Sequence, residues 1–234
     1  MNSNNCDTVP IVSVRKIKPT RRSLSGRYAF RHKSTVPFES SLERDFVIRQ
    51  EFDLNVSDVV SQPCCISYVA PSGRTYKYTP DFLVTYRLTD HIYPDFPRPL
   101  LVEVKPENDW RKNWRIWLPK WKAAYRYAKH NGWDFRIYDE FRIAGGAALK
   151  NIRFLEMFRR DSKCYYETEH SMILKTVTAM GSVPIHYLIA RHYMGHYRAQ
   201  GIAHIWYLLA SRRLDCNILE PLNEFTHVWV ANHG

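Results

Sequence analysis

The sequence predicts an α/β domain, in which helices flank a mixed β-sheet, followed by a helical domain. Between residues 40 and 138, runs with strand-like alternation are interspersed with helical segments, in the order helix, three strands, helix, strand. This order favours a mixed sheet covered by helices. After Gly145-Gly146 the pattern changes to helices. With 234 residues, of which 45% are hydrophobic, the chain can form one large domain or two small ones.

The chain carries a net charge of +11, which indicates a polyanionic partner, most commonly nucleic acid. Residues 1–33 are rich in Arg and Lys and contain a single acidic residue, Asp7. We expect them to form a basic arm that is mobile alone and either orders along a phosphate backbone or partner, or stays solvated. No apolar run approaches the length of a membrane span, and the first residues lack a signal-peptide core. We therefore expect a cytoplasmic protein with no membrane partner.

The cysteines and histidines favour neither a disulfide framework nor a zinc site. Five cysteines form no CxxC pair and leave one unpaired in any disulfide scheme, so we expect reduced thiols. His192 and His196 are four residues apart, a spacing that can place two imidazoles on one helix face. However, Gly195 interrupts that helix and no further ligands complete a zinc set, so surface histidines are favoured over a metal site.

The first helix is predicted to begin near residue 40 or 41 and to end near Phe52. Ser40 and Glu43 have the spacing of a capping box, which gives Glu43 a structural role at the helix start. The alternative is that Glu43 supplies a carboxylate to a site at the sheet. The sequence leaves both roles open, and Glu39 and Glu51 remain alternative carboxylates.

Three strands follow this helix, after a connection or short strand at residues 53–60. Alternating and apolar runs place them at Cys64–Ala70, Tyr78–Tyr86 and Leu100–Pro106. A turn at Pro71–Arg74 joins the first two strands, and a proline-rich surface loop at Asp90–Pro99 leads to the third.

The third strand carries two charges in an otherwise apolar run. Residues two apart share one face of a strand, so Glu103 and Lys105 point the same way. Packing does not require a carboxylate and an ammonium in so apolar a strand. If Asp81 of the neighbouring strand lies close by, two carboxylates meet a lysine, a set that can hold a hard divalent cation and a water beside a phosphodiester.

A second helix is predicted to open at Pro119, the favoured first position, and to run to about His130 before Gly132 ends it. Trp133–Tyr138 then alternates as a further strand.

Aromatic and basic residues share the region around this helix. The four-residue spacing of Trp117, Trp121 and Tyr125 favours a core stripe over a base-stacking platform. We expect the basic residues on other faces to bind DNA phosphates without sequence preference. They are Arg111, Lys112, Arg115, Lys120, Lys122 and Arg126, with Lys129 beside them.

The C-terminal residues 147–234 are predicted to be mainly helical. Helices are expected at about Ala147–Arg160, Glu167–Met180, Pro184–Tyr193 and Arg198–Arg213, followed by short strands at Leu214–Leu219 and Thr226–Val230. Three helices and a hairpin suggest a winged helix-turn-helix. Its candidate recognition helix is the last one, which holds Arg198, Gln200, His204, Arg212 and Arg213, and the three arginines are expected to bind DNA. The alternative is a helical domain that docks a protein.

Pro80-Asp81 and Glu103-Val104-Lys105 together resemble the PD-(D/E)xK nuclease signature. The resemblance implies a restriction-endonuclease-like fold, with residues 34–144 as the nuclease domain. The competing interpretation is a pair of ordinary strand ends with a solvated ion pair.

The whole chain further resembles TnsA, the endonuclease subunit of heteromeric cut-and-paste transposases, including versions found beside CRISPR effectors. The resemblance rests on Arg21–Gly26, Ser41-Leu42-Glu43, Tyr78–Phe82, Val102–Lys105 and the helical tail. It implies that Glu43, Asp81 and Glu103, with Val104, bind the metal ions, and that Lys105 orients the attacking water. Some members carry Gln at the position of Glu103, so this chain has the fuller set, which favours an active enzyme.

The resemblance also implies a reaction and partners. Two Mg²⁺ ions, or Mn²⁺ in their place, would support hydrolysis of the 5′, non-transferred strand at each end of a transposon in the bacterial cytoplasm. A TnsB-like transposase would process the 3′ strand, and a TnsC-like ATPase would be the second partner. Two alternatives stay open: a stand-alone nuclease of restriction or repair type, and a non-enzymatic DNA-binding adaptor.

Overall fold

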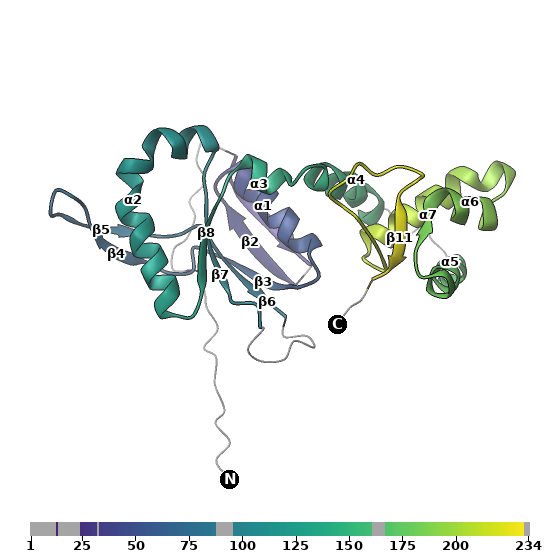
Figure 1. Cartoon of the computed structure of the whole chain (residues 1–234), viewed down its shortest axis with the longest axis horizontal. Helices are drawn as coiled ribbons and strands as arrows, with labels where there is room; N and C mark the ends of the chain where they lie inside the picture. The colour runs from purple at the N-terminus through teal and green to yellow at the C-terminus, as the bar shows by residue number, and fades with distance from the viewer. Residues whose placement is uncertain (1–12, 14–23, 32, 88–95, 161–166, 232–234) are drawn as a thin grey trace, which may run out of the picture. The chain divides into compact units, whose positions relative to one another are not determined.

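The computed structural model describes residues 13, 24–31, 33–87, 96–160 and 167–231, which fall into two compact units (Figure 1). Unit 1 comprises the described residues up to Gln50 and residues Asn55–Glu140, whereas unit 2 comprises Glu51–Leu54 and the described residues from Phe141 onward. Among the described helices, none combines the length and the apolar character that crossing a lipid bilayer requires.

Unit 1 contains the mixed sheet that the sequence predicts. Its four strands are β3 (Val56–Ser61), β6 (Phe82–Tyr86), β7 (Leu100–Val104) and β8 (Asp134–Tyr138), in the order β3-β6-β7-β8. The β7–β8 pair is parallel and the other two pairs are antiparallel. The segment that the sequence left as a connection or short strand is therefore the edge strand β3.

Helices α1 (Ser41–Phe52) and α2 (Glu107–His130) lie on opposite sides of this sheet (Figure 1). On the α1 side, the ring of Phe46 stacks on that of Phe82 at 5.2 Å between centroids. On the α2 side, Leu83 and Leu101 pack against Trp121, Ala124 and Ala128, which the helical repeat places on one face. The alternation of β7 thus turns Leu101 and Glu103 toward α2.

Helix α2 begins twelve positions earlier than predicted, at Glu107, so the expected start at Pro119 is wrong. Pro119 lacks an amide hydrogen and so removes one helical hydrogen bond, but Trp110 and Trp117 on the preceding turns still pack against the core. Tertiary packing therefore extends the helix through the proline. The predicted end is confirmed, since Asn131 caps the helix and Gly132 follows with a positive φ of 72°.

Two hairpins complete unit 1: β1 (Gly26–Phe30) with β2 (Ser34–Phe38), and β4 (Ile66–Val69) with β5 (Thr75–Tyr78). Strand β4 was expected in the main sheet, but it pairs only with β5. The strand predicted at Tyr78–Tyr86 is in fact two strands, because Tyr78 ends β5 and the proline segment separates it from β6. The turn between β4 and β5 forms as predicted, and Gly73 takes a φ of 77°.

The predicted basic arm lies largely outside the described residues, as does most of the proline-rich loop. The last part of the arm is described and forms strand β1. This strand pairs with β2, which begins at Ser34, directly after the predicted end of the arm at residue 33.

Unit 2 is mainly helical, as predicted. Its helices are α3 (Glu140–Ala144, from the unit boundary), α4 (Ala148–Arg160), α5 (Glu167–Met180), α6 (Ile185–His192), a 3₁₀ turn (Gly195–Tyr197) and α7 (Arg198–Ala210). Strands β9 (Val183–Pro184), β10 (Leu214–Cys216) and β11 (His227–Val230) form an antiparallel sheet in the order β10-β11-β9. The sequence did not predict β9, which is only two residues long.

Candidate active site

The ends of β6 and β7 bring Asp81 beside the charged end of β7. The Asp81 backbone is fixed on both sides, since its amide donates to the Val102 carbonyl at 3.0 Å and its carbonyl accepts from Gln62 at 2.8 Å. Its side-chain Oδ2 accepts the Val104 amide at 2.7 Å. The carboxylate is thereby held against the strand that carries Glu103.

Lys105 joins the two carboxylates. Its Nζ lies 3.3 Å from Asp81 Oδ2 and 3.4 Å from Glu103 Oε1, and it donates to the Val104 carbonyl at 2.9 Å. Asp81 therefore lies close to Glu103 and Lys105, which is the condition on which the predicted site depended.

Glu103 is almost fully buried, with its side chain 1% exposed. Its Oε2 accepts the Tyr78 hydroxyl at 2.6 Å, and its Oε1 accepts Lys120 Nζ at 2.9 Å. A buried carboxylate is costly unless it is paired and hydrogen-bonded, and both conditions are met here.

The clustered charges shift the pKa values at the site. Burial, followed by repulsion from Glu103, raises the pKa of Asp81 to about 8. Burial alone lowers the pKa of Lys105, but attraction to Asp81 and Glu103 outweighs it, so the net pKa of Lys105 is raised. Burial and then the neighbouring Glu103 raise the pKa of Tyr78, which keeps its hydroxyl as a donor.

Glu43 stands at the start of α1 and makes the predicted capping box. Its amide donates to Ser40 Oγ at 3.1 Å, while its Oε1 accepts the Ser40 hydroxyl at 3.1 Å and its Oε2 accepts the Glu39 amide at 2.7 Å. Burial raises the pKa of Glu43, and attraction to Lys105 opposes this rise. The Glu43 carboxylate therefore interacts electrostatically with a residue of the cluster. The structure thus shows the structural role and leaves the second role as a prediction.

The residues at the end of β7 suit a hard divalent cation. Within the described part of the chain, no three His, Cys, Asp or Glu side chains are grouped closely enough to hold a metal ion by themselves. Mg²⁺, however, binds proteins through one or two carboxylates and retains several waters. Asp81, Glu103 and the Val104 carbonyl offer this kind of oxygen set, and burial together with repulsion from Glu103 raises the pKa of Asp81, so a bound cation would favour its ionised form. The donor set therefore fits Mg²⁺ or Mn²⁺.

Residues 53–140 match the family described as the TnsA-like endonuclease N-terminal domain. This segment is similar to a TnsA-like endonuclease domain, and we refer to it below as the TnsA-like domain. The TnsA-like domain contains Asp81, Glu103 and Lys105, and it begins after Glu43. No curated protein matches the chain.

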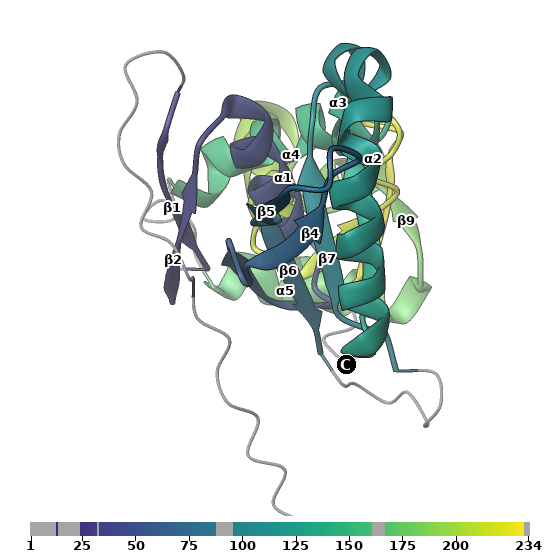
Figure 2. The same cartoon turned by 90° about the vertical axis from the view of Figure 1, so that its left-hand side faces the viewer.

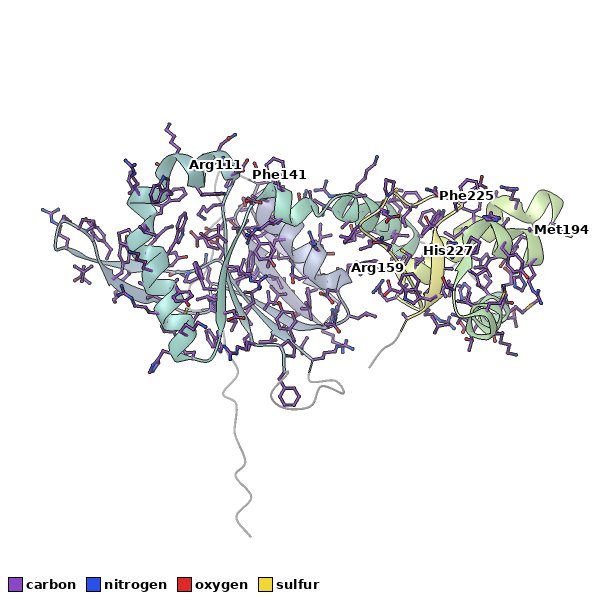
Figure 3. The ribbon with its side chains drawn as sticks, viewed as in Figure 1. Arg111, Phe141, Arg159, Met194, Phe225 and His227 are labelled. Atoms are coloured by element: carbon purple, nitrogen blue, oxygen red, sulfur yellow. The ribbon has the colours of Figure 1, made fainter. Side chains whose placement is uncertain are left out.

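The basic residues predicted to bind DNA from α2 occupy different environments within the TnsA-like domain. Arg111, near the amino-terminal end of α2, is exposed but pairs with Glu107 at 2.6 Å (Figure 3). Lys112 is exposed. Lys120 points into the domain toward Glu103 with its side chain 16% exposed, so it belongs to the site and not to the outer surface.

Three further basic residues of α2 line one groove. Figure 2 shows the β4–β5 hairpin beside α2, and between them lies a groove of about 530 Å³. Arg115, Lys122 and Arg126 line it from α2, and Tyr68 lines it from β4. Among the described residues, no acidic side chain lines the groove, so it presents positive charge next to an aromatic ring.

Helix α7, the predicted recognition helix, is largely buried, whereas a helix that reads DNA must expose one face. Beyond Gln200, every residue of α7 is buried or partly buried, and His204 is 0% exposed. Helix α4 covers one side of α7, where Phe154 meets Trp206 at 5.4 Å. The prediction of α7 as an exposed recognition helix is therefore wrong for all but its first turn, because a buried face cannot enter a groove of DNA.

The arginines assigned to that helix form ion pairs within unit 2. Arg212 and Arg213 lie after α7, which ends at Ala210. Arg212 pairs with Asp215 at 2.8 Å and packs over the Phe52 ring, and Arg213 makes two hydrogen bonds to Glu167. Arg198, in the first turn, pairs with Glu224 at 2.7 Å.

The cysteines and His192 were also considered in the sequence analysis, as thiols and as a possible zinc ligand. Among the described residues, Cys64, Cys65 and Cys216 are free thiols, as predicted. His192 contacts Thr176 Oγ1 at 2.9 Å through Nε2.

Sequence reasoning missed two residues of the site, Tyr78 and Lys120. Tyr78 was counted as the first residue of the Asp81 strand, and Lys120 as one of many basic residues on a helix. The spacing along the chain gives no sign that both reach Glu103, since they lie 25 and 17 positions from it. Only the packing of the hairpin and α2 against β7 brings them there.

Proposed function

We propose that this protein is a metal-dependent DNA endonuclease that cleaves the 5′, non-transferred strand at the ends of a transposon. The observation that carries the proposal is the cluster of Asp81, Glu103 and Lys105 at adjoining strand ends inside the TnsA-like domain. A solvated ion pair at ordinary strand ends would not bury a carboxylate to 1% exposure beside a second carboxylate of raised pKa.

Each group of the cluster has a role in phosphodiester hydrolysis. Asp81, Glu103 and the Val104 carbonyl would hold Mg²⁺, with Glu43 as a further candidate ligand. The bound ions supply charge neutralisation and lower the pKa of a bound water. Lys105, in contact with both carboxylates, is placed to orient the nucleophile or to stabilise the charge that develops on the phosphate.

The basic groove between β4 and α2 supports DNA as the substrate. Its three cations, Arg115, Lys122 and Arg126, are exposed and face no lining carboxylate. Cations that contact phosphates position a protein on DNA without reading its sequence. We infer that this groove follows the DNA backbone, together with Lys112 and Arg111 on the same helix.

The TnsA-like domain also supports a place in a multi-protein reaction. An endonuclease of this type would act with a TnsB-like transposase, which processes the 3′ strand, and with a TnsC-like ATPase. We therefore expect weak cleavage by the protein alone and strong cleavage in the presence of its partners.

A winged-helix identity for unit 2 rests on its element order. Helix α5, strand β9, helices α6 and α7, and strands β10 and β11 follow the order of a winged helix, and β11 lies between β10 and β9. Because α4 covers α7, we favour a role in partner binding or phosphate contact through its edges over base reading by α7.

The test is strand-specific cleavage of labelled transposon-end DNA in Mg²⁺, with and without the two partners. We expect Asp81→Ala and Lys105→Ala to abolish cleavage while folding and DNA binding are retained, because both residues act on the reacting groups. Asp109→Ala and Lys77→Ala are matched controls, since both side chains are exposed and lie in the same unit.

Each outcome separates the candidate functions. Partner-dependent cleavage of the 5′ strand that Asp81→Ala removes would support the proposal. Cleavage by the protein alone would indicate a stand-alone nuclease. Full cleavage by Asp81→Ala would contradict the assigned site, and a complete absence of metal-dependent cleavage would leave only a DNA-binding adaptor.

A further inference from the structure

Lys120 sits in an aromatic cage within the TnsA-like domain. Its Nζ lies 4.8 Å from the ring centroid of Tyr78, 5.0 Å from that of Trp117 and 6.0 Å from that of Trp121. Rings at these distances attract an ammonium through their π faces. Lys122, two residues along the same helix, is by contrast exposed.

The ammonium of Lys120 is directed at a carboxylate of the site. It donates to Glu103 Oε1 at 2.9 Å, and Glu103 is itself 1% exposed. A lysine that binds DNA phosphates needs its ammonium in solvent, whereas this one is held between three rings and a buried carboxylate. Lys120 is thus unsuited to the phosphate contact that the sequence predicted.

Tyr78 contributes to the same arrangement twice. Its ring forms one wall of the cage, and its hydroxyl donates to Glu103 Oε2 at 2.6 Å. Both oxygens of Glu103 are therefore held by groups that come from β5 and α2, outside the strand that carries the signature. Lys105 Nζ, at 3.4 Å, approaches the same Oε1 that Lys120 holds.

We propose that Lys120 is a positioning residue that fixes the Glu103 carboxylate toward Lys105 and Asp81. Two donors on separate elements set the rotation of the carboxylate: Tyr78 on one oxygen and Lys120 on the other. Groups that orient metal ligands in this way typically change metal affinity or activity by about 10- to 100-fold when they are removed. This inference rests on the proposed nuclease function.

Loss of the ammonium should separate metal binding from turnover. Without Lys120, the site carries one positive charge fewer, so a divalent cation is attracted more strongly. The carboxylate also loses the group that sets its orientation, so the bound ion is less well placed for hydrolysis. A purely structural role would instead lower metal binding, DNA binding and cleavage together.

The test compares Lys120→Met with Lys120→Arg. Methionine keeps an unbranched side chain that packs well against aromatic rings but removes the charge, whereas arginine retains a cation for the cage and for Glu103. Lys77→Met is the matched control on β5, and Lys122→Met shows the effect of removing an exposed cation from the groove. Wild type, Asp81→Ala and all four variants are assayed as full chains with the partner proteins.

Two measurements are made on each variant: Mn²⁺ binding by electron paramagnetic resonance, and the single-turnover cleavage rate at saturating DNA. For Lys120→Met we expect Mn²⁺ affinity that is equal to or higher than that of wild type, and a cleavage rate lower by on the order of 30-fold. Lys120→Arg should restore the rate to within about fivefold of wild type, since it keeps the charge. Lys122→Met should weaken DNA binding while Mn²⁺ binding stays unchanged.

The proposal would be overturned if Lys120→Met cleaved DNA at the rate of wild type. It would also be overturned if Lys120→Met folded but lost Mn²⁺ binding and DNA binding together. Failure of the proposed function looks different, because wild type would then show no cleavage that Asp81→Ala removes. If Lys120→Met does not fold, Lys120→Arg decides: a rate near that of wild type supports the role of the charge, and Mn²⁺ binding without cleavage contradicts it.

Discussion

At the scale of single residues, the site brings the carboxylates of Asp81 and Glu103 together with the ammonium groups of Lys105 and Lys120. Burial, and then repulsion from Glu103, disfavours the ionised form of Asp81. The result is a carboxyl group, Asp81, whose pKa of about 8 keeps it largely protonated at neutral pH when no cation is bound. A group with so large a shift beside a lysine is typical of a functional site.

The raised pKa of Asp81 predicts how stability depends on pH in the absence of metal. The folded state holds the Asp81 proton more tightly than the unfolded state, so its contribution to stability is complete below about pH 4 and is lost as the pH rises to about 8. Asp81→Asn stays neutral, and we expect it to exceed wild type in the free energy of unfolding by on the order of 2 kcal/mol at pH 8.

Urea unfolding in EDTA at pH 4.5 and pH 8.5 measures this difference. The variant and wild type should differ little at the lower pH and most at the higher pH. Addition of Mg²⁺ at pH 8.5 should stabilise wild type but not Asp81→Asn. An equal stability of both proteins at pH 8.5 would show that Asp81 ionises normally in the fold.

At the scale of elements, each end of a helix or strand that borders the site has a defined structural cause. The capping box sets the start of α1. The segment with Pro80 separates β5 from β6, so that Asp81 lies between the two strands. Helix α2 runs through Pro119 and so carries Lys120 on the same face as Trp121 and Trp117. The elements are thus ordered by packing against the sheet as much as by local preference.

The capping box allows the two roles of Glu43 to be separated by mutation. Glutamine is accepted at this position of a capping box, so Glu43→Gln should keep the helix start and lose a negatively charged ligand. Ser40→Ala should lower the free energy of unfolding by about 1 kcal/mol, because it removes the cap.

Cleavage rates and urea unfolding of both variants give the answer. If Glu43 binds metal, Glu43→Gln loses cleavage and remains stable, while Ser40→Ala cleaves normally. If Glu43 is only a cap, Glu43→Gln cleaves at the rate of wild type.

Helix α7 offers a second prediction at this scale, at Gly201. A Cβ atom added there would lie 2.4 Å from the ring of Tyr193, although alanine is normally favoured over glycine within a helix. We expect Gly201→Ala to destabilise unit 2 by about 1 to 3 kcal/mol, as other overpacked cores do. Thermal unfolding measures it. A stabilised Gly201→Ala would mean that Tyr193 moves aside at no cost.

At the scale of the whole molecule, positive charge is distributed unequally between free and paired side chains. The three cations of the groove in unit 1 face no lining carboxylate. In unit 2, Arg198, Arg212 and Arg213 each form an ion pair with an acidic residue. The net charge of +11 alone does not distinguish these two situations.

The distinction predicts the salt dependence of DNA binding. The logarithm of the binding constant falls with the logarithm of salt concentration by about 0.9 for each phosphate contact. Alanine substitution of Arg115, Lys122 and Arg126 together should therefore make the slope shallower by about 2 to 3. The slope is measured by fluorescence anisotropy on labelled duplex DNA at salt concentrations from about 50 to about 300 mM.

Arg213→Ala is the contrasting variant, because its partner Glu167 already neutralises it. We expect its slope to match that of wild type. A shallower slope for Arg213→Ala and an unchanged slope for the triple variant would place the DNA surface on unit 2.

Local patterns in the sequence were enough to predict several parts of this protein. Alternation indicated a strand that includes β6, an apolar run indicated β7, the Gly-containing turn indicated the β4–β5 hairpin, and the spacing of Ser40 and Glu43 indicated the cap. Strand periodicity predicted that Glu103 and Lys105 share a face, and the resemblance to the nuclease signature added Asp81.

Only the tertiary structure decided which other residues reach that face. Tyr78 and Lys120 approach Glu103 from β5 and α2, and no local pattern encodes a contact between elements so far apart in the chain. The same reason explains the errors: Pro119 lies inside a helix because packing against the sheet outweighs the lost hydrogen bond, and α7 is buried because α4 covers it. Local preference sets the elements, whereas the burial of apolar surface sets their neighbours.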